Sequence, residues 1–257
     1  MSWEYLKHRK SRSRFESLST IALLLVLVGF VLATTVPLFQ QERNGGRNEL
    51  RYRAKGMGLA SHNFHSTFKQ LPPLLPDDAT DSNVEERISV FTSLLPFLEH
   101  PRLYERVDKG VVWTHRANRD VYGTRVETFE WPEEQRPYYE NEKTVDGYAI
   151  VHFSPNLRII STPGEPMRME DITDGPGKTI LLGTIDDARV PAWGDPMNMR
   201  DPASGFAGGP HAFGGFPEWG AVMLFADGNV DNLSKKIDPK VAKALATPNG
   251  GETVGDY

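Results

Sequence analysis

The sequence predicts an α+β protein, in which an N-terminal membrane-spanning helix precedes a domain whose mixed, mainly antiparallel sheet packs on a helix. Three observations predict this class: an uncharged apolar segment at residues 17–41, an amphipathic helical pattern at 48–68, and an Asp-Gly pair between two strand-like runs near the C-terminus. The chain has 257 residues, of which 39% are hydrophobic and 25% are charged. That composition is typical of a globular protein with one sizeable domain.

The first element is the uncharged segment at 17–41. A helix needs about 20 apolar residues to cross a hydrocarbon core of ~30 Å. A soluble surface helix would show a polar face, and this segment has none. We therefore expect a transmembrane helix that contains Ile21, Leu25, Gly29 and Leu32. The alternative is a cleaved signal peptide, which would require a shorter apolar core and small residues at the cleavage site.

The flanks of this segment predict its orientation. Residues 1–16 contain five basic and two acidic residues, a net charge of +3. We therefore expect these residues to be a cytoplasmic tail, and the protein to cross the inner membrane once with its N-terminus inside. Subtracting this charge from the formal −5 of the whole chain leaves about −8 for the remainder, which we expect to be periplasmic. A negatively charged domain has no general attraction for nucleic acid, so nucleic acid is excluded as a partner. The expected partner of the helix is the lipid bilayer. The chain contains no cysteine, so no disulfide stabilises the domain.

The extracytoplasmic domain is expected at 42–246, followed by a flexible tail at 247–257. Glycines at 43–47 predict an interruption before the amphipathic helix at 48–68, and prolines at 72–73 predict its end. We expect a short helix pair at 90–98, an irregular region at 109–148 and a final helix at 239–246. The predicted strands are 148–153, 179–184, 221–226 and 229–233. The last two flank Asp227-Gly228, which predicts a hairpin with a type I′ turn.

Four sequence blocks carry a resemblance to a known family. They read KGMGLASHNFH at 55–65, followed by LPP at 71–73; TSLLPFLE at 92–99; ITDGPGKTI at 172–180; and LFADGNV at 224–230. In this order they resemble a large family, found mainly in planctomycetes, of pilin-like proteins with an uncharacterised ectodomain. The family's C-terminal signature is described as a prepilin-processing-associated His-X9-Asp-Gly motif.

The resemblance implies the plan of a type II secretion pseudopilin: an N-terminal helix half in the membrane, with a small antiparallel sheet packed on its outer half. The sequence departs from the family at two places. Its processing signal is degenerate, because no glycine occurs among residues 1–28, where Phe15 follows Arg14. In addition, fifteen residues rather than nine separate His211 from Asp227.

Candidate sites for chemistry are few. His62 and His65 are three residues apart on a predicted helix, a spacing that could place both imidazoles on one metal, but no third ligand is near in sequence. We expect them instead to be polar partners of loops over the helix. His211 and Asp227 could form an acid–base pair, although the turn alone explains Asp227. Asp174-Gly175 is expected to form a turn before a strand.

No cofactor is expected. The acidic groups Asp171/Asp174, Asp186/Asp187 and Asp227/Asn229/Asp231 could donate oxygens to calcium but lack the spacing of a twelve-residue calcium loop. No phosphate-binding loop, nucleophile elbow or zinc-protease motif is present. We therefore expect no enzyme.

These features leave three functional hypotheses, of which an ectoenzyme that uses His211 and Asp227 ranks last. The first is a non-catalytic, pseudopilin-like membrane protein in an assembly or secretion apparatus, whose partners are other pseudopilin-like or envelope proteins. The second is an anchored ligand-binding or sensory module, in which exposed aromatic residues stack on sugars or polymers. Its candidate residues are Trp113, Trp131, Tyr138, Tyr139, Trp193 and Trp219.

Overall fold

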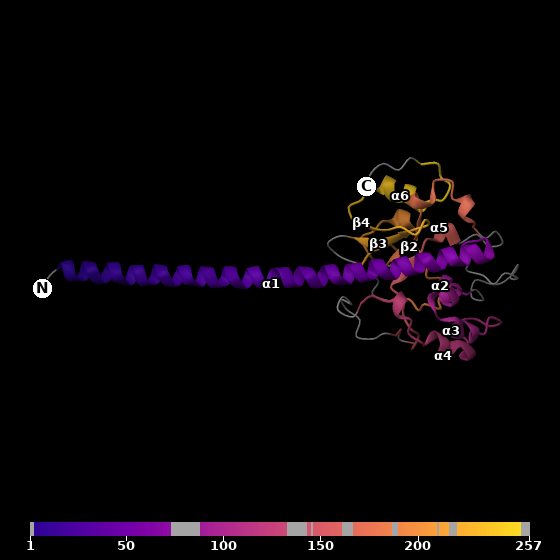
Figure 1. The fold of residues 1–257 in the computed structure, drawn as a ribbon, viewed down its shortest axis with the longest axis horizontal. Helices are drawn as coiled ribbons and strands as arrows, with labels where there is room; N and C mark the ends of the chain where they lie inside the picture. Colours follow the sequence, from indigo (N-terminus) through magenta and orange to yellow (C-terminus); the bar gives the residue numbers. More distant parts are fainter. Residues whose placement is uncertain are drawn as a thin grey trace. The chain divides into compact units, whose positions relative to one another are not determined.

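A computed structural model describes residues 3–72, 88–132, 143–144, 146–160, 167–186, 190–209, 211–215 and 220–252. The chain divides into two compact units, Met1–Arg47 and Asn48–Tyr257. The second unit has α+β architecture, with a four-stranded antiparallel sheet and several helices, as the sequence predicts (Figure 1).

The longest element is helix α1, Trp3–Phe68. The predicted interruption at 43–47 is wrong, because α1 is continuous through these residues. Each glycine there costs about 1 kcal/mol relative to alanine, but a helix that continues on both sides needs no new nucleus. The predicted end is confirmed: Lys69 adopts φ 59° and its N–H donates to His65 O at 2.8 Å. Among the residues described, no helix is long and apolar enough to cross a membrane.

The sheet has the order β1-β2-β3-β4, and every pairing is antiparallel. Its strands are β1 (Phe153–Pro155), β2 (Ile180–Thr184), β3 (Ala221–Phe225) and β4 (Val230–Leu233). The last three lie where the sequence predicts strands. The strand predicted at 148–153 is wrong except for Phe153, where β1 begins, because Ala149 and Ile150 form only isolated bridges.

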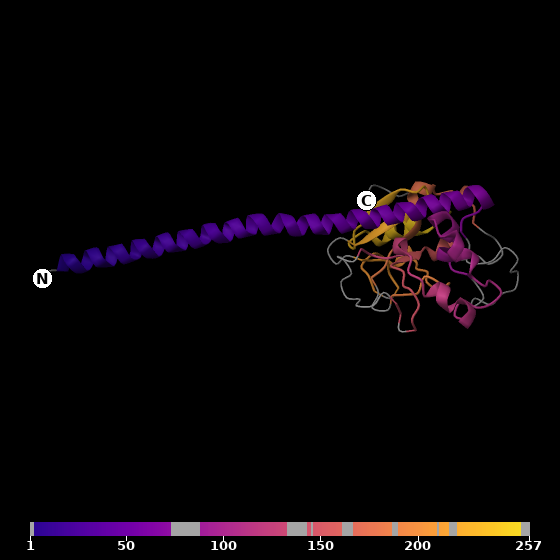
Figure 2. The ribbon, with the colours of Figure 1, turned by 60° about the horizontal axis from the view of Figure 1, so that its bottom comes forward.

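The two faces of the sheet pack on different helices. Alternate residues of β3, Val222 and Leu224, belong to the core that contains Met57 of α1. Met223 and Phe225 belong to the opposite core with α6, Pro239–Ala246, the final helix that the sequence predicts. Figure 1 accordingly shows the sheet between the end of α1 and α6, and Figure 2 shows from a second direction that α1 crosses the yellow C-terminal strands. This alternation explains why nearly all of the sheet is buried.

Short helices make up much of the rest of the second unit. The predicted pair at 90–98 is confirmed as α2 (Val90–Leu94) and the 3-10 helix η2 (Leu95–Leu98), with Pro96 in the first turn of η2. The region predicted to be irregular contains short helices in its described part. The remaining helices are α3 (Pro101–Glu105), η3 (Arg116–Asn118), α4 (Arg119–Tyr122), η4 (Glu127–Phe129), α5 (Leu157–Ile160), η6 (Met169–Asp171), η7 (Pro176–Lys178) and η8 (Pro202–Ser204). Of these short helices, α2, α3 and α4 lie on the side of α1 away from the sheet (Figure 1).

The β3–β4 hairpin is confirmed, but its turn differs from the predicted type I′. Gly228 N–H donates to Phe225 O at 2.9 Å, and Phe225 N–H donates to Asn229 O at 2.8 Å. Only Gly228 has a positive φ (86°), whereas a type I′ turn requires two such residues. The loop therefore has three residues, and glycine occupies the left-handed position at its end.

Candidate functional site

Three of the four sequence blocks meet where α1 crosses the β3–β4 hairpin. Gly58 of α1 faces the hairpin so closely that a Cβ built on it would lie 2.9 Å from Leu224 Cδ1 and 3.4 Å from Gly228 Cα. One turn further along α1, His62 lies beside Gly228, where an added Cβ would be 3.4 Å from His62 Nε2. The helix and the Asp-Gly turn are thus fitted to each other through two glycines.

The ITDGPGKTI block packs on the same turn. Asp227 N–H donates to Pro176 O at 3.1 Å, and Ala226 N–H donates to Thr179 O at 2.9 Å. The Asp227 carboxylate accepts from Asn229 N–H at 2.8 Å. Asp174, in the predicted turn before β2, accepts from Gly250 N–H and Gly251 N–H at 2.7 and 2.9 Å. Gly175 follows with φ 99°, a conformation that favours glycine.

His211 is not brought to this junction. Its loop is attached near the C-terminal end of β2, where Gly214 N–H donates to Thr184 O. Asp227 lies at the other end of β2, about 13 Å away for a five-residue strand. The two residues therefore do not form an acid–base pair in this structure. The segment 216–219, which separates His211 from the turn, lies outside the described residues.

The two histidines of α1 have different surroundings. His65 Nε2 lies 4.0 Å from Glu170 Oε2, whereas His62 Nε2 faces the hairpin without a hydrogen-bond partner in the described part of the chain. Within the same part, no three His, Asp or Glu side chains gather closely enough to hold a metal ion. This includes the acidic groups considered for calcium, except that Asp187 lies outside the described residues.

The close approach at Gly58 leads to a testable prediction. Gly58→Ala is expected to destabilise the protein by about 1 to 3 kcal/mol, because the added methyl group overpacks the junction. Gly56→Ala is the matched control on the same helix, since nothing lies within 4 Å of its Cβ position. It is expected to stabilise by up to about 1 kcal/mol through helix propensity. Chemical unfolding of both variants measures the difference; equal effects would contradict the tight fit at Gly58.

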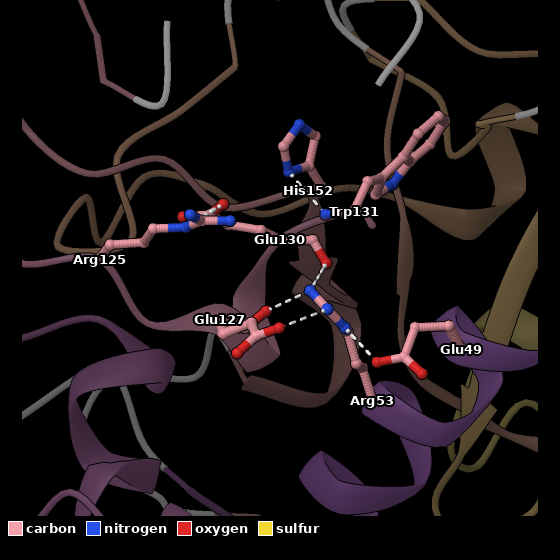
Figure 3. Close-up of polar contacts among 7 residues, drawn as sticks. All are labelled: Glu49, Arg53, Arg125, Glu127, Glu130, Trp131 and His152. Carbon is pink, nitrogen blue, oxygen red and sulfur yellow. Dashed lines mark hydrogen bonds and ion pairs between the residues drawn. The ribbon is translucent and has the colours of Figure 1, made fainter. Parts of the chain in front are cut away.

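A second polar cluster ties α1 to the segment 127–131 (Figure 3). Arg53, whose side chain is 9% exposed, donates to the carbonyl oxygens of Glu127 and Glu130 at 2.6 and 2.9 Å. Its guanidinium also bonds the carboxylates of Glu127 at 3.1 Å and of Glu49, one turn back on α1, at 3.0 Å. A single arginine thus joins α1 to η4 and the residue after it.

The same segment is held from its other side. The Glu130 carboxylate is fully buried and accepts from Arg125 Nε at 2.8 Å. Trp131 N–H donates to His152 Nδ1 at 3.1 Å, as Figure 3 shows, so that nitrogen must be unprotonated. The backbone N–H of His152 in turn donates to the backbone oxygen of Phe129 at 2.7 Å. Because buried charges are stable only when they are paired, this cluster constrains how the segment lies on α1.

Sequence reasoning missed this cluster, although one signal was present. Arg53 lies between Leu50 and Met57 at helical spacing, on the apolar face of the amphipathic helix. A charged residue on such a face must find partners when it is buried. Its partners come from a segment 74 to 77 residues later, and no local pattern marks them.

Two of the aromatic residues considered for ligand stacking are core residues. Trp131 and Trp193 are 2% and 0% exposed, and Trp193 packs on Tyr122 with ring centroids 4.6 Å apart. Burial raises the pKa of Tyr122 to about 12. Trp113 is partly buried against Tyr148. The burial of Trp131 and Trp193 counts against both residues as ligand contacts. Tyr138, Tyr139 and Trp219 lie outside the described residues.

A further ion pair lies away from both clusters. The Arg158 guanidinium donates to both carboxylate oxygens of Asp201, at 2.8 and 2.7 Å. These hydrogen bonds hold the pKa of Asp201 below its usual value. Because Asp201 precedes η8, and η8 contacts α6, the pair stabilises the loop that borders the second core.

Comparisons with known proteins identify one family. The model of a family of proteins of unknown function, DUF1559, matches residues 51–211, more than half of the chain. The match includes the first three sequence blocks and ends before the β3–β4 hairpin. No curated protein and no solved structure matches the chain.

Proposed function

The chain belongs to the DUF1559 family of proteins of unknown function, and we propose that it is a non-catalytic, membrane-anchored protein of pseudopilin type. In this proposal, α1 anchors the chain in the inner membrane with its N-terminus inside. The second unit then lies in the periplasm and takes part in envelope assembly or secretion. The observation that carries the proposal is a continuous run of exposed apolar side chains on α1.

This run occupies residues 24–32. Nine residues make two and a half helical turns, so the exposed side chains surround the helix. Soluble proteins rarely expose so much contiguous apolar surface, and burial in hydrocarbon is worth about 25 cal/mol per Å². This exposed apolar surface therefore supports a lipid environment around the run. The exposed residues, 52–68% accessible, are Leu24, Leu25, Val26, Leu27, Val28, Phe30, Val31 and Leu32.

The second unit supports the pseudopilin part of the proposal. Met57 and Phe64 of α1 are buried in this unit, and an antiparallel sheet packs on the helix, the plan that the family resemblance implies. On the outer face of the same segment, Tyr52 and Leu59 are 75% and 64% exposed and seven residues apart. Residues at this spacing lie on one face of a helix, where another helix can contact them.

Charged substitutions test the membrane anchor. The double variant Leu25→Arg, Phe30→Arg is expected to move the full-length chain from the carbonate-resistant membrane pellet to the soluble fraction, because each arginine costs about 2.5 to 3.5 kcal/mol at a helix centre in a membrane. Leu59→Arg is the control, since Leu59 has similar exposure but lies in the second unit. If the double variant stays in the pellet as the wild type does, the anchor is contradicted.

Cysteine crosslinking tests assembly. Because the chain has no native cysteine, each introduced cysteine is its only thiol, and any disulfide must form at that position. Leu59→Cys is expected to give disulfide-linked multimers in oxidised membranes, whereas Met197→Cys, similarly exposed at 60% in a loop, is expected to stay monomeric. Monomers for both variants would contradict assembly and favour the anchored binding module. The intact mass of the membrane-extracted chain reports whether cleavage occurs at the Arg14-Phe15 junction.

A further inference from the structure

The outer edge of β4 has an unusual hydrogen-bonding pattern. Among the described strands, β4 pairs only with β3, so its other side is an edge of the sheet. An edge strand presents unpaired N–H and C=O groups, which can bind a strand of another chain. Which groups point outward follows from the register of the pair.

The register places Val230 and Asn232 at the edge. Phe225 N–H donates to Asn229 O, which makes these residues a hydrogen-bonded pair. Because hydrogen-bonded and non-hydrogen-bonded pairs alternate in an antiparallel ladder, Leu224/Val230 and Val222/Asn232 are non-hydrogen-bonded pairs. The Val222 N–H confirms this alternation, because it donates to Thr184 Oγ1 at 3.0 Å and therefore points away from β4. The backbone groups of Val230 and Asn232 therefore point away from β3.

Three of these four outward groups are already bonded to side chains. Val230 N–H donates to Asn229 Oδ1 at 3.1 Å, and Asn232 N–H donates to Asp231 Oδ1 at 2.7 Å. Val230 O accepts from Arg51 Nη2 of α1 at 2.5 Å. Arg51 Nη1 also lies 3.7 Å from Asp231 Oδ1, which links two of the three side chains.

We propose that Arg51, Asn229 and Asp231 close the β4 edge against strand addition, so that an extended segment of a second copy cannot lengthen the sheet. An incoming strand would have to displace three hydrogen bonds, one of them donated by a charged guanidinium. It would also approach the Arg51 and Asp231 charges at the centre of the edge. Because all three side chains belong to the second unit, this closure does not depend on the membrane anchor or on the proposed function.

Two alanine substitutions remove the acceptors that occupy the edge. In the double variant Asn229→Ala, Asp231→Ala, amide hydrogen exchange at Val230 and Asn232 is expected to become about 5- to 10-fold faster, as the loss of one net hydrogen bond predicts. The full-length chain in detergent is expected to show roughly a twofold or larger rise in protein mass by light scattering, because the freed edge pairs with a second copy. Asn229→Asp and Asp231→Asn are the matched controls, since each keeps a side-chain oxygen in place.

Both measurements must change together. An alanine variant that exchanges at the wild-type rate would show that the side chains do not occupy the edge. Faster exchange with an unchanged mass would show that their removal does not admit a strand; either result overturns the proposal. Arg51→Ala gives an independent third variant that leaves both acceptors intact, and near-wild-type unfolding of all variants separates edge pairing from aggregation of unfolded chains.

Discussion

Replacing Arg53 with alanine is expected to lower the free energy of unfolding by about 2 to 4 kcal/mol, because two hydrogen bonds from a buried charged donor to backbone carbonyl groups are lost, each worth roughly 1.5 to 3 kcal/mol. The substitution deprives the carbonyl groups of Glu127 and Glu130 of a charged donor and leaves the Glu127 and Glu49 carboxylates without it. The segment 127–131 would then lose its direct bond to α1. Guanidinium unfolding of the full-length chain measures the change.

The control for this substitution is Lys55→Ala, at an exposed position two residues further along α1. Its effect is expected to stay within about 0.5 kcal/mol, as for most surface changes. Arg53→Lys is expected to recover only part of the loss, because one ammonium group cannot match the geometry of the planar guanidinium fork. If Arg53→Ala and Lys55→Ala change the free energy of unfolding equally, the cluster in Figure 3 does not hold the segment 127–131 on α1.

Gly220→Ala, directly before β3, is expected to destabilise the protein by about 3 to 5 kcal/mol. A Cβ at this position would lie 2.0 Å from Leu233 O, a backbone atom that cannot move without distorting the β3–β4 pairing. Gly220 also has φ 98°, which an alanine adopts only with strain. Both effects act in the folded state, so a lowered thermal midpoint and a lowered unfolding free energy are expected together.

Gly205→Ala separates the two effects. Gly205 has a similar φ of 91°, but nothing lies within 4 Å of its Cβ position. Its substitution is expected to cost only the backbone strain, about 1 to 3 kcal/mol, because Gly205 has ψ −172° in a region that is almost restricted to glycine. Equal losses at the two glycines would mean that strain alone matters and that the contact with Leu233 O is relieved at no cost.

Local patterns predicted most elements of the second unit. The end of α1 follows from Pro72, the turn residues around Asp227-Gly228 predict the hairpin, and α6 begins at Pro239, as expected of proline in a first turn. Local patterns were less reliable where neighbours decide the outcome. The glycines at 43–47 do not break α1, and the first strand begins at Phe153 and excludes the β-branched residues Ile150 and Val151.

By itself, the sequence determined the order of the elements, the apolar run on the N-terminal helix and the family to which the chain belongs, because these depend on residues close together in the chain. Only the tertiary structure decided which distant groups meet. It brought Gly58 and His62 to the Asp-Gly turn, placed His211 at the other end of β2, and paired Arg53 with the segment 127–131. Such contacts depend on how helix and sheet faces pack across 70 residues or more, and no periodicity within one element records them.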